Sequence, residues 1–133
     1  MTQEDKELLL KDFSARLPYE VKVQHQHPNY LDEIQTIERI TREYGIIETE
    51  SVLGFVDDFK PYLRPMSSMT EDEVKEFYDV ECMDAKVGYI KPTWNWHFTI
   101  NGIDWLNAHH FDYRGLIEKG LAISTEENNP YEN

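Results

Sequence analysis

The 133-residue sequence predicts a single α+β domain, in which an antiparallel β-meander packs against three helices. Apolar residues recur at helical spacing near the N-terminus, β-branched runs with turn signals follow, and a proline-rich joint then leads into a capped helix. These patterns predict an N-terminal helix, a middle helix and a short C-terminal helix. A second possibility for this fold is that the sheet is small and barrel-like. Residues 1–124 form the domain, and the polar residues 125–133 are expected to be a flexible tail.

The first helix is predicted over residues 2–17. Thr2 and Asp5 resemble a helix cap, and Pro18 ends the segment. Its apolar residues recur at helical spacing: Leu9, Leu10, Phe13 and Leu17. Residues 19–23 alternate between apolar and polar and predict a strand, after which Pro28 and Asn29 indicate a turn.

Residues 31–44 fit either a helix or a strand. Leu31, Ile34 and Ile37 have helical spacing, but β-branched residues are dense and Gly45 interrupts the run. Residues 46–49 follow as a partner, so we interpret the segment as a strand of a meander. One more short strand or turn is expected over residues 53–59.

Residues 60–73 form a proline-rich joint without a catalytic signature. Pro61 and Pro65 fix φ and lack an N–H, so residues 60–65 are predicted to be extended and not central in a sheet. The next residues match a capping box, which predicts a helix over residues 71–78. The box is Thr70 and Glu73, the expected staple joins Met66 or Met69 to Val74, and the apolar stripe is Val74, Phe77 and Tyr78.

Residues 86–100 contain the clearest alternation of apolar and polar residues, which predicts a strand with an aromatic face. The aromatic residues of this face are Trp94, Trp96 and Phe98. Asn101 and Gly102 are interpreted as a turn before a short helix over residues 103–109, with Trp105 and Leu106 facing inward. Residues 111–124 are expected to form a docked segment that reverses at Gly115 and Gly120.

Composition excludes several classes of protein. The chain is 40% hydrophobic with 17 aromatic residues (8 Tyr, 6 Phe and 3 Trp), which predicts a folded core. Its net charge of −13 is spread along the chain, so a solvated surface explains it better than a binding tail. No basic cluster predicts direct nucleic-acid binding, and no apolar run could span a membrane. The single cysteine, Cys82, and the N-terminus without an export signal predict a reducing cytoplasm.

Several long segments resemble a known family. They are residues 60–73 (KPYLRPMSSMTEDE), residues 103–107 (IDWLN) and residues 110–117 (HFDYRGLI), with further similarity at residues 6–12 and 15–19. They are similar to small uncharacterised proteins of Bacteroides-type gut bacteria, their prophages and their phages. The resemblance implies a phage or prophage setting, and it assigns no catalytic or cofactor-binding residue.

Histidines and two acidic runs invite a metal site. The acidic runs, residues 57–58 and 71–73, are expected at a turn and at a helix cap, and neither has the spacing of a calcium loop. His25 and His27 would share one face of a strand and could be joined by His97, His109 and His110. The spacing differs from that of zinc sites, and neither a metal nor a cofactor is predicted. His110 and Asp112 invite an acid-base interpretation, yet no nucleophile lies in a suitable context. Arg114 is expected to pair with Asp112 or a glutamate.

Two classes of function remain for this chain. The preferred one is a non-enzymatic accessory protein that binds another protein, because aromatic residues and arginines anchor interfaces. Its variant is an acidic decoy that imitates DNA and blocks a host nucleic-acid-binding protein. The rival class is a small metal-dependent hydrolase that uses the histidines. The candidate contact residues are Tyr62, Arg64, Trp94, Trp96, Tyr113 and Arg114.

Overall fold

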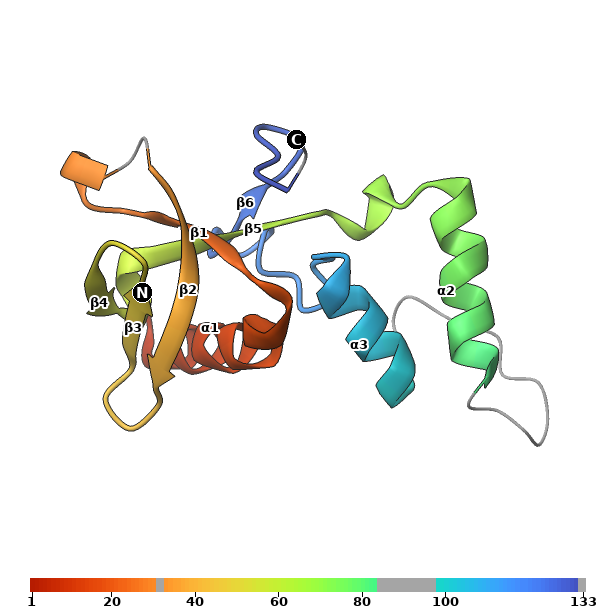
Figure 1. Cartoon of the computed structure of the whole chain (residues 1–133), viewed down its shortest axis with the longest axis horizontal. Coiled ribbons are helices and arrows are strands. Elements are labelled where there is room, and N and C mark those ends of the chain that lie inside the picture. Colours follow the sequence, from red (N-terminus) through yellow and green to blue (C-terminus); the bar gives the residue numbers. More distant parts are fainter. Residues whose placement is uncertain (31–32, 84–97, 132–133) are drawn as a thin grey trace.

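The computed structural model describes residues 1–30, 33–83 and 98–131. Its centre is a six-stranded sheet in the order β4-β3-β2-β1-β5-β6 (Figure 1). All neighbouring strands are antiparallel except β5 and β6, which are parallel. The strands are β1 (Lys22–His25), β2 (Ile34–Thr41), β3 (Ile46–Thr49), β4 (Leu53–Phe55), β5 (Phe59–Leu63) and β6 (Ile123–Ser124). The α+β class is therefore confirmed, and the barrel-like variant is wrong because the described sheet is open, with β4 and β6 as its two edges.

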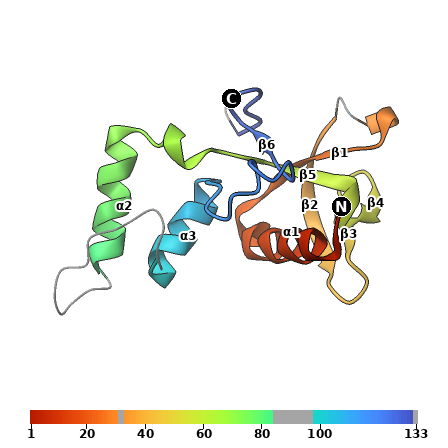
Figure 2. The ribbon, with the colours of Figure 1, turned by 180° about the vertical axis from the view of Figure 1, so that it is seen from behind.

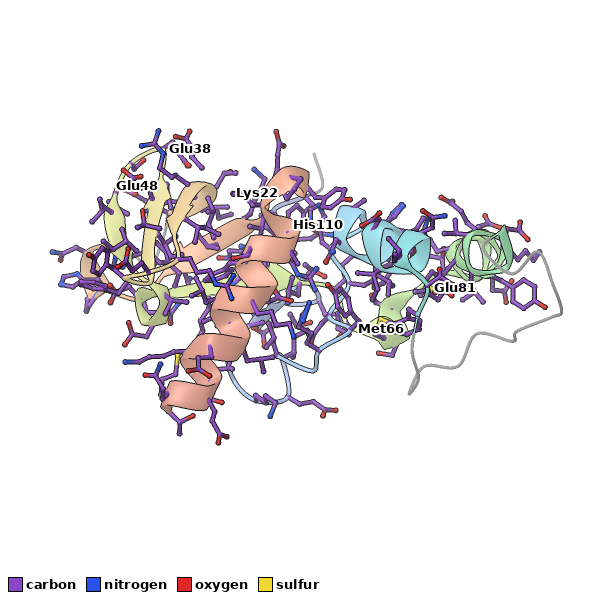
Figure 3. All side chains as sticks on the ribbon, turned by 90° about the horizontal axis from the view of Figure 1, so that it is seen from below. Lys22, Glu38, Glu48, Met66, Glu81 and His110 are labelled. Carbon is purple, nitrogen blue, oxygen red and sulfur yellow. The ribbon has the colours of Figure 1, made fainter. Side chains whose placement is uncertain are left out.

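In the described ranges three α-helices accompany the sheet, namely α1 (Gln3–Arg16), α2 (Glu71–Met83) and α3 (Ile100–Ala108). Helix α1 crosses one face of the sheet, as the view from below shows (Figure 3). Helices α2 and α3 lie beyond the sheet, where β5 leads out of it (Figure 2). None of the helices in the described ranges is long and apolar enough to cross a bilayer.

Helix α1 begins and packs as its sequence predicts. The Thr2 hydroxyl accepts a hydrogen bond from the Asp5 N–H at 3.1 Å, which satisfies one donor of the first turn. Leu9 and Phe13 are fully buried against the sheet. The helical spacing of apolar residues therefore identified the buried face correctly.

The meander is also confirmed. Strands β2 and β3 pair in antiparallel register, with Ile40 opposite Ile47, so the choice of strand over helix for this segment is correct. Gly45 has a φ of +62°, a conformation that favours glycine, and it closes the turn between the two strands.

The joint is extended but lies closer to the centre of the sheet than predicted. Strand β5 lies between β1 and β6, and Pro61 is paired with Val23 of β1. The expectation that residues 60–65 avoid the centre of the sheet is wrong. Strand β6 pairs only with Tyr62 and Leu63, so it needs no backbone N–H from Pro61.

The capping box at the start of α2 is confirmed. The Thr70 hydroxyl accepts from the Glu73 N–H at 3.2 Å, and the Glu73 carboxylate accepts from the Thr70 N–H at 3.0 Å. The helix continues to Met83, past the predicted end at residue 78. The expected staple does not hold Val74, which is 40% exposed. Met66 and Met69 pack instead against the cluster around Phe77.

The start of α3 differs from the sequence interpretation. Asn101 and Gly102 lie inside the helix instead of in a turn, and Thr99 is the cap, its hydroxyl accepting from the Gly102 N–H at 3.0 Å. A Cβ on Gly102 would overlap the Glu81 carboxylate, so this glycine permits a close approach between α2 and α3. The inward positions of Trp105 and Leu106 are confirmed. The predicted aromatic strand falls largely on residues 84–97, outside the described ranges.

The described part of the chain contains two hydrophobic clusters. The first lies between α1 and the sheet and the second between α2 and α3. The first contains Leu9, Phe13, Val21, Val23, Ile37, Ile47, Val56, Phe59, Leu63, Leu116, Leu121 and Ala122. The second contains Phe77, Trp105, Leu106 and Phe111.

The chain reverses after α3 where predicted. Gly115 and Gly120 both have a φ of +74°, which an L-residue adopts only with strain. Within the segment expected to be a flexible tail, Tyr131 docks on the sheet, its hydroxyl donating to the Tyr62 carbonyl at 2.9 Å. This contact ties the segment up to residue 131 to the fold.

Candidate interaction surface

Two of the predicted contact residues serve the fold. Tyr62 is only 3% exposed. Arg64 forms two hydrogen bonds to Glu73, at 2.6 and 2.7 Å, and its guanidinium lies 4.1 Å from the centre of the Phe111 ring. These bonds from Arg64 are the main reason that the pKa of Glu73 falls to about 2. Arg64 thus links residues 60–65 to the first turn of α2, and its guanidinium is engaged in that contact.

Tyr113 and Arg114 are likewise engaged within the molecule. The Tyr113 hydroxyl donates to Asn107 Oδ1 at 2.7 Å. Arg114 lies over the Tyr113 ring and forms an ion pair with Asp12, with 3.3 Å between Nε and Oδ1. The expected partner Asp112 is therefore wrong. Trp94 and Trp96 lie outside the described residues.

A buried ionic cluster joins α1 to the segment after α3. Asp12 and Arg16 are both fully buried and are linked at 2.8 Å, and Arg16 Nη2 also donates to the Phe111 carbonyl at 2.6 Å. Burial raises the pKa of Asp12 even though Arg16 and Arg114 oppose the shift. The carboxylate of Asp112 accepts the backbone N–H groups of Leu116 and Ile117. The cluster therefore has an architectural role.

Of the histidines considered for a metal site, His25 and His27 both accept backbone N–H groups of nearby residues. His25 Nδ1 accepts the backbone N–H of His27 at 3.0 Å, and His27 Nδ1 accepts that of Asn29 at 3.2 Å. His97 lies outside the described ranges. Within those ranges, no group of three or more His, Cys, Asp or Glu residues is placed to hold a metal ion. His110 stacks on Tyr131 while Asp112 caps the following turn, so those two do not form an acid-base pair.

Among the residues that the structure describes, the most exposed group of neighbouring apolar side chains lies on β4 and on the turn before β3, at the end of the sheet away from α2 and α3 (Figure 1). We call it the outer-strand patch. It consists of Tyr44, Leu53 and Phe55, which are 66%, 62% and 56% exposed. Leu53 and Phe55 share one face of β4 because side chains two residues apart on a strand point the same way. Tyr44 and Phe55 line the same hollow of about 450 Å³, which lies against the first turns of α1.

The free edge of β4 is short, and one of its outward-pointing backbone groups is occupied. Val56 N–H donates to the Gly45 carbonyl and Thr49 N–H to the Val52 carbonyl, so in the antiparallel register the backbone groups of Leu53 and Phe55 point away from β3. The Phe55 N–H is occupied by Asp58 Oδ2 at 2.8 Å. An edge strand of three residues offers few backbone hydrogen bonds to another strand.

The surroundings of the patch are acidic. Residues 42–58 hold five acids and one base. Glu38 and Glu48 lie near each other on the β2–β3 side of the sheet (Figure 3), and Glu48 forms an ion pair with Arg39 at 3.6 Å. The hollow beside the patch is lined by three acids (Glu7, Glu43 and Asp57) and two bases (Lys6 and Arg42), so a partner that buries the patch meets a rim in which acids outnumber bases.

Sequence reasoning missed the patch because a three-residue strand carries too little pattern. The available signal was Gly54, between two large apolar residues. A Cβ on Gly54 would lie 3.0 Å from the Phe59 ring, so β4 packs closely against Phe59 at Gly54 and leaves its two larger residues exposed.

Comparisons with protein-family models, with curated proteins and with solved structures found no match.

Proposed function

We propose that the protein acts by contact, as a non-enzymatic accessory protein that binds another protein in a phage- or prophage-carrying bacterial cytoplasm. The outer-strand patch is the binding surface. The observation that carries the proposal is the exposure of Tyr44, Leu53 and Phe55 on adjoining segments. Contiguous apolar exposure of this kind is typical of interaction sites in small soluble domains.

The patch has the chemistry of an interface anchor. Burying the exposed part of a Leu or Phe side chain contributes about 1–2 kcal/mol, and aromatic residues dominate the energetics of protein interfaces. The polar groups first considered for contact are engaged elsewhere, Arg64 with Glu73 and Arg114 with Asp12. Apolar side chains therefore supply most of the affinity at this surface.

The partner is a protein with an apolar pocket surrounded by Lys and Arg. Complementarity to the acidic rim at residues 42–58 favours a basic surface, and opposite charges across an interface raise the association rate. The short edge of β4, with its Phe55 N–H occupied, favours docking through side chains over addition of a strand.

The test is a cross-linking capture from a Bacteroides-type lysate with three proteins. They are the wild type, the double variant Leu53→Ser/Phe55→Ser, and Ile100→Ser as the matched control. Ile100 is 80% exposed but lies on α3, away from the patch. We expect the wild type and the control to capture the same basic protein, and the double variant to lose at least about tenfold of it.

Folding is checked by melting temperature, because both changes replace exposed side chains and leave the core intact. The proposal is overturned if all three proteins capture the same partner equally. It is also overturned if the wild type captures no protein.

The acidic decoy is the second candidate, and the net charge of −13 is the observation that favours it. The two candidates differ in their response to salt. A complex that depends on charge weakens steeply between 0.05 and 0.5 M NaCl, because the Debye length falls from about 14 to about 4 Å. A complex anchored by the patch keeps most of its affinity over the same range.

A further inference from the structure

The hydrogen-bond ladder between β1 and β5 contains a foreign group at its end. The Gln26 N–H donates to the Asp58 carbonyl. In an antiparallel pair of strands, every second pair of opposite residues is hydrogen-bonded. Counting back from Gln26 and Asp58 in this register, the backbones of Lys22 and Tyr62 should therefore bond directly. Instead the Tyr131 hydroxyl lies between them. It accepts from the Lys22 N–H at 3.0 Å and donates to the Tyr62 carbonyl at 2.9 Å.

The ring of Tyr131 is held as closely as its hydroxyl. It stacks on the His110 ring, with 3.5 Å between the centroids and 8° between the planes. His110 has a φ of +64°, a conformation that costs about 1–3 kcal/mol for a residue other than glycine. Its backbone is fixed on both sides, by the Asn107 carbonyl at 3.1 Å and by the Arg64 N–H at 2.8 Å.

These groups together recognise a phenol. A phenol has one hydroxyl that both donates and accepts, and the site supplies one acceptor and one donor on either side of it. An aromatic ring without the hydroxyl would leave both backbone groups unpaired, which is costly away from water. Burial raises the pKa of Tyr131, which agrees with a neutral hydroxyl in this position.

We propose that the end of the β1–β5 ladder is a phenol-binding site and that Tyr131 is its built-in occupant. The C-terminal segment is then a latch, because residues 126–128 are exposed and Tyr131 fixes the far end of the segment. When the latch leaves, the site accepts a free phenol or the tyrosine side chain of another polypeptide. An adjoining hollow of about 530 Å³, lined by Arg64, Ser68, His109 and His110, gives access to it.

The first test removes the occupant and adds a small replacement, p-cresol, to the full chain. In Tyr131→Ala we expect p-cresol at ten times its Kd to raise the melting temperature by about 4 °C, since a ligand that binds only the folded state stabilises it. The wild type and Tyr131→Phe should show no such rise, because their own rings fill the site. Equal shifts in all three proteins, or none in Tyr131→Ala, would overturn the proposal.

A synthetic peptide that contains one tyrosine, added to Tyr131→Ala in the same assay, distinguishes the two sources of the phenol. A rise with both ligands extends the site to polypeptides, whereas a rise with p-cresol alone restricts it to small phenols.

The second test does not depend on Tyr131→Ala folding well. In Tyr131→Phe the ring still separates the strands but the hydroxyl is lost. Hydrogen exchange of the Lys22 amide should then become about tenfold faster, the effect of one hydrogen bond. Unchanged exchange at Lys22 would show that the hydroxyl makes no productive bond and would overturn the proposal.

Discussion

At the scale of single residues, the buried carboxylate of Asp12 carries a large cost in free energy, because a charge has been removed from water. It faces two arginines, since Arg16 lies 2.8 Å and Arg114 3.3 Å from its oxygens. Arg16 Nη1 is buried without a hydrogen-bond partner among the described residues. Attraction between buried ions is offset by the cost of removing them from water, and the raised pKa of Asp12 is the sign of that cost.

Replacing one member of this cluster is therefore predicted to be severe. Asp12→Asn leaves Arg16 buried without a counter-charge, and the expected loss is about 3–5 kcal/mol in the free energy of unfolding. Urea denaturation followed by circular dichroism measures it. Asp57→Asn is the matched control, because its ion pair with Lys6, at 3.4 Å, is exposed and should change the free energy by less than about 1 kcal/mol. Equal losses in the two variants would contradict this account.

The cluster also marks where sequence reasoning stops at this scale. Arg114 was given a carboxylate partner, which is correct in kind, but the partner is Asp12 on the first helix and not the neighbouring Asp112. Sequence spacing reports which side chains share a helix face or a strand face. It does not report which distant segments the fold brings together, and for the same reason Tyr62 was mistaken for a surface residue.

At the scale of elements, local rules worked where the interactions are local. Thr2 at the start of α1 and the Thr70–Glu73 box involve residues three apart, and both were predicted. The start of α3 was misread because Asn-Gly usually signals a turn, while here Gly102 is needed to make room for Glu81 of α2. That requirement is tertiary and leaves no local signal.

Glu81 itself links the two helices. It is 6% exposed, and both of its carboxylate oxygens accept the Thr99 N–H at the start of α3, at 3.1 and 3.3 Å. A negative charge at this end of a helix is favourable, because it opposes the positive end of the helix dipole. Glu81 therefore acts as a second cap for α3, supplied from α2.

We predict that Glu81→Gln lowers the free energy of unfolding by about 1 kcal/mol, through loss of the charge next to the dipole. Glu76→Gln is the control on the same helix. Its side chain is 58% exposed, and glutamine keeps an oxygen for the Trp105 indole N–H, which lies 2.9 Å from Glu76. That control should change the free energy by less than about 0.5 kcal/mol. Urea titration measures the free energy of unfolding of both variants. A larger loss for Glu76→Gln than for Glu81→Gln would refute the role of Glu81 as a second cap.

At the scale of the whole molecule, two cores share one seam. The cluster under α1 and the cluster between α2 and α3 meet at Phe111. Its carbonyl accepts a hydrogen bond from Arg16, and its ring packs against the Arg64 guanidinium. Composition predicted an aromatic core but gave no sign of its division. The charge was easier to anticipate, because a net of −13 spread along the sequence becomes an acidic surface in any fold that exposes its polar residues.

That charge predicts how salt affects stability. Self-repulsion among 26 acids and 13 bases opposes the compact state, and added ions screen it. Raising NaCl from 0.01 to 0.15 M should therefore raise the melting temperature by about 2–5 °C. Four exposed changes to glutamine, at Glu43, Glu118, Glu126 and Glu127, take the net charge from −13 to −9 and should reduce this gain. Attractive ion pairs respond oppositely, so a melting temperature that falls with salt would mean that pairs such as Arg64–Glu73 outweigh the repulsion.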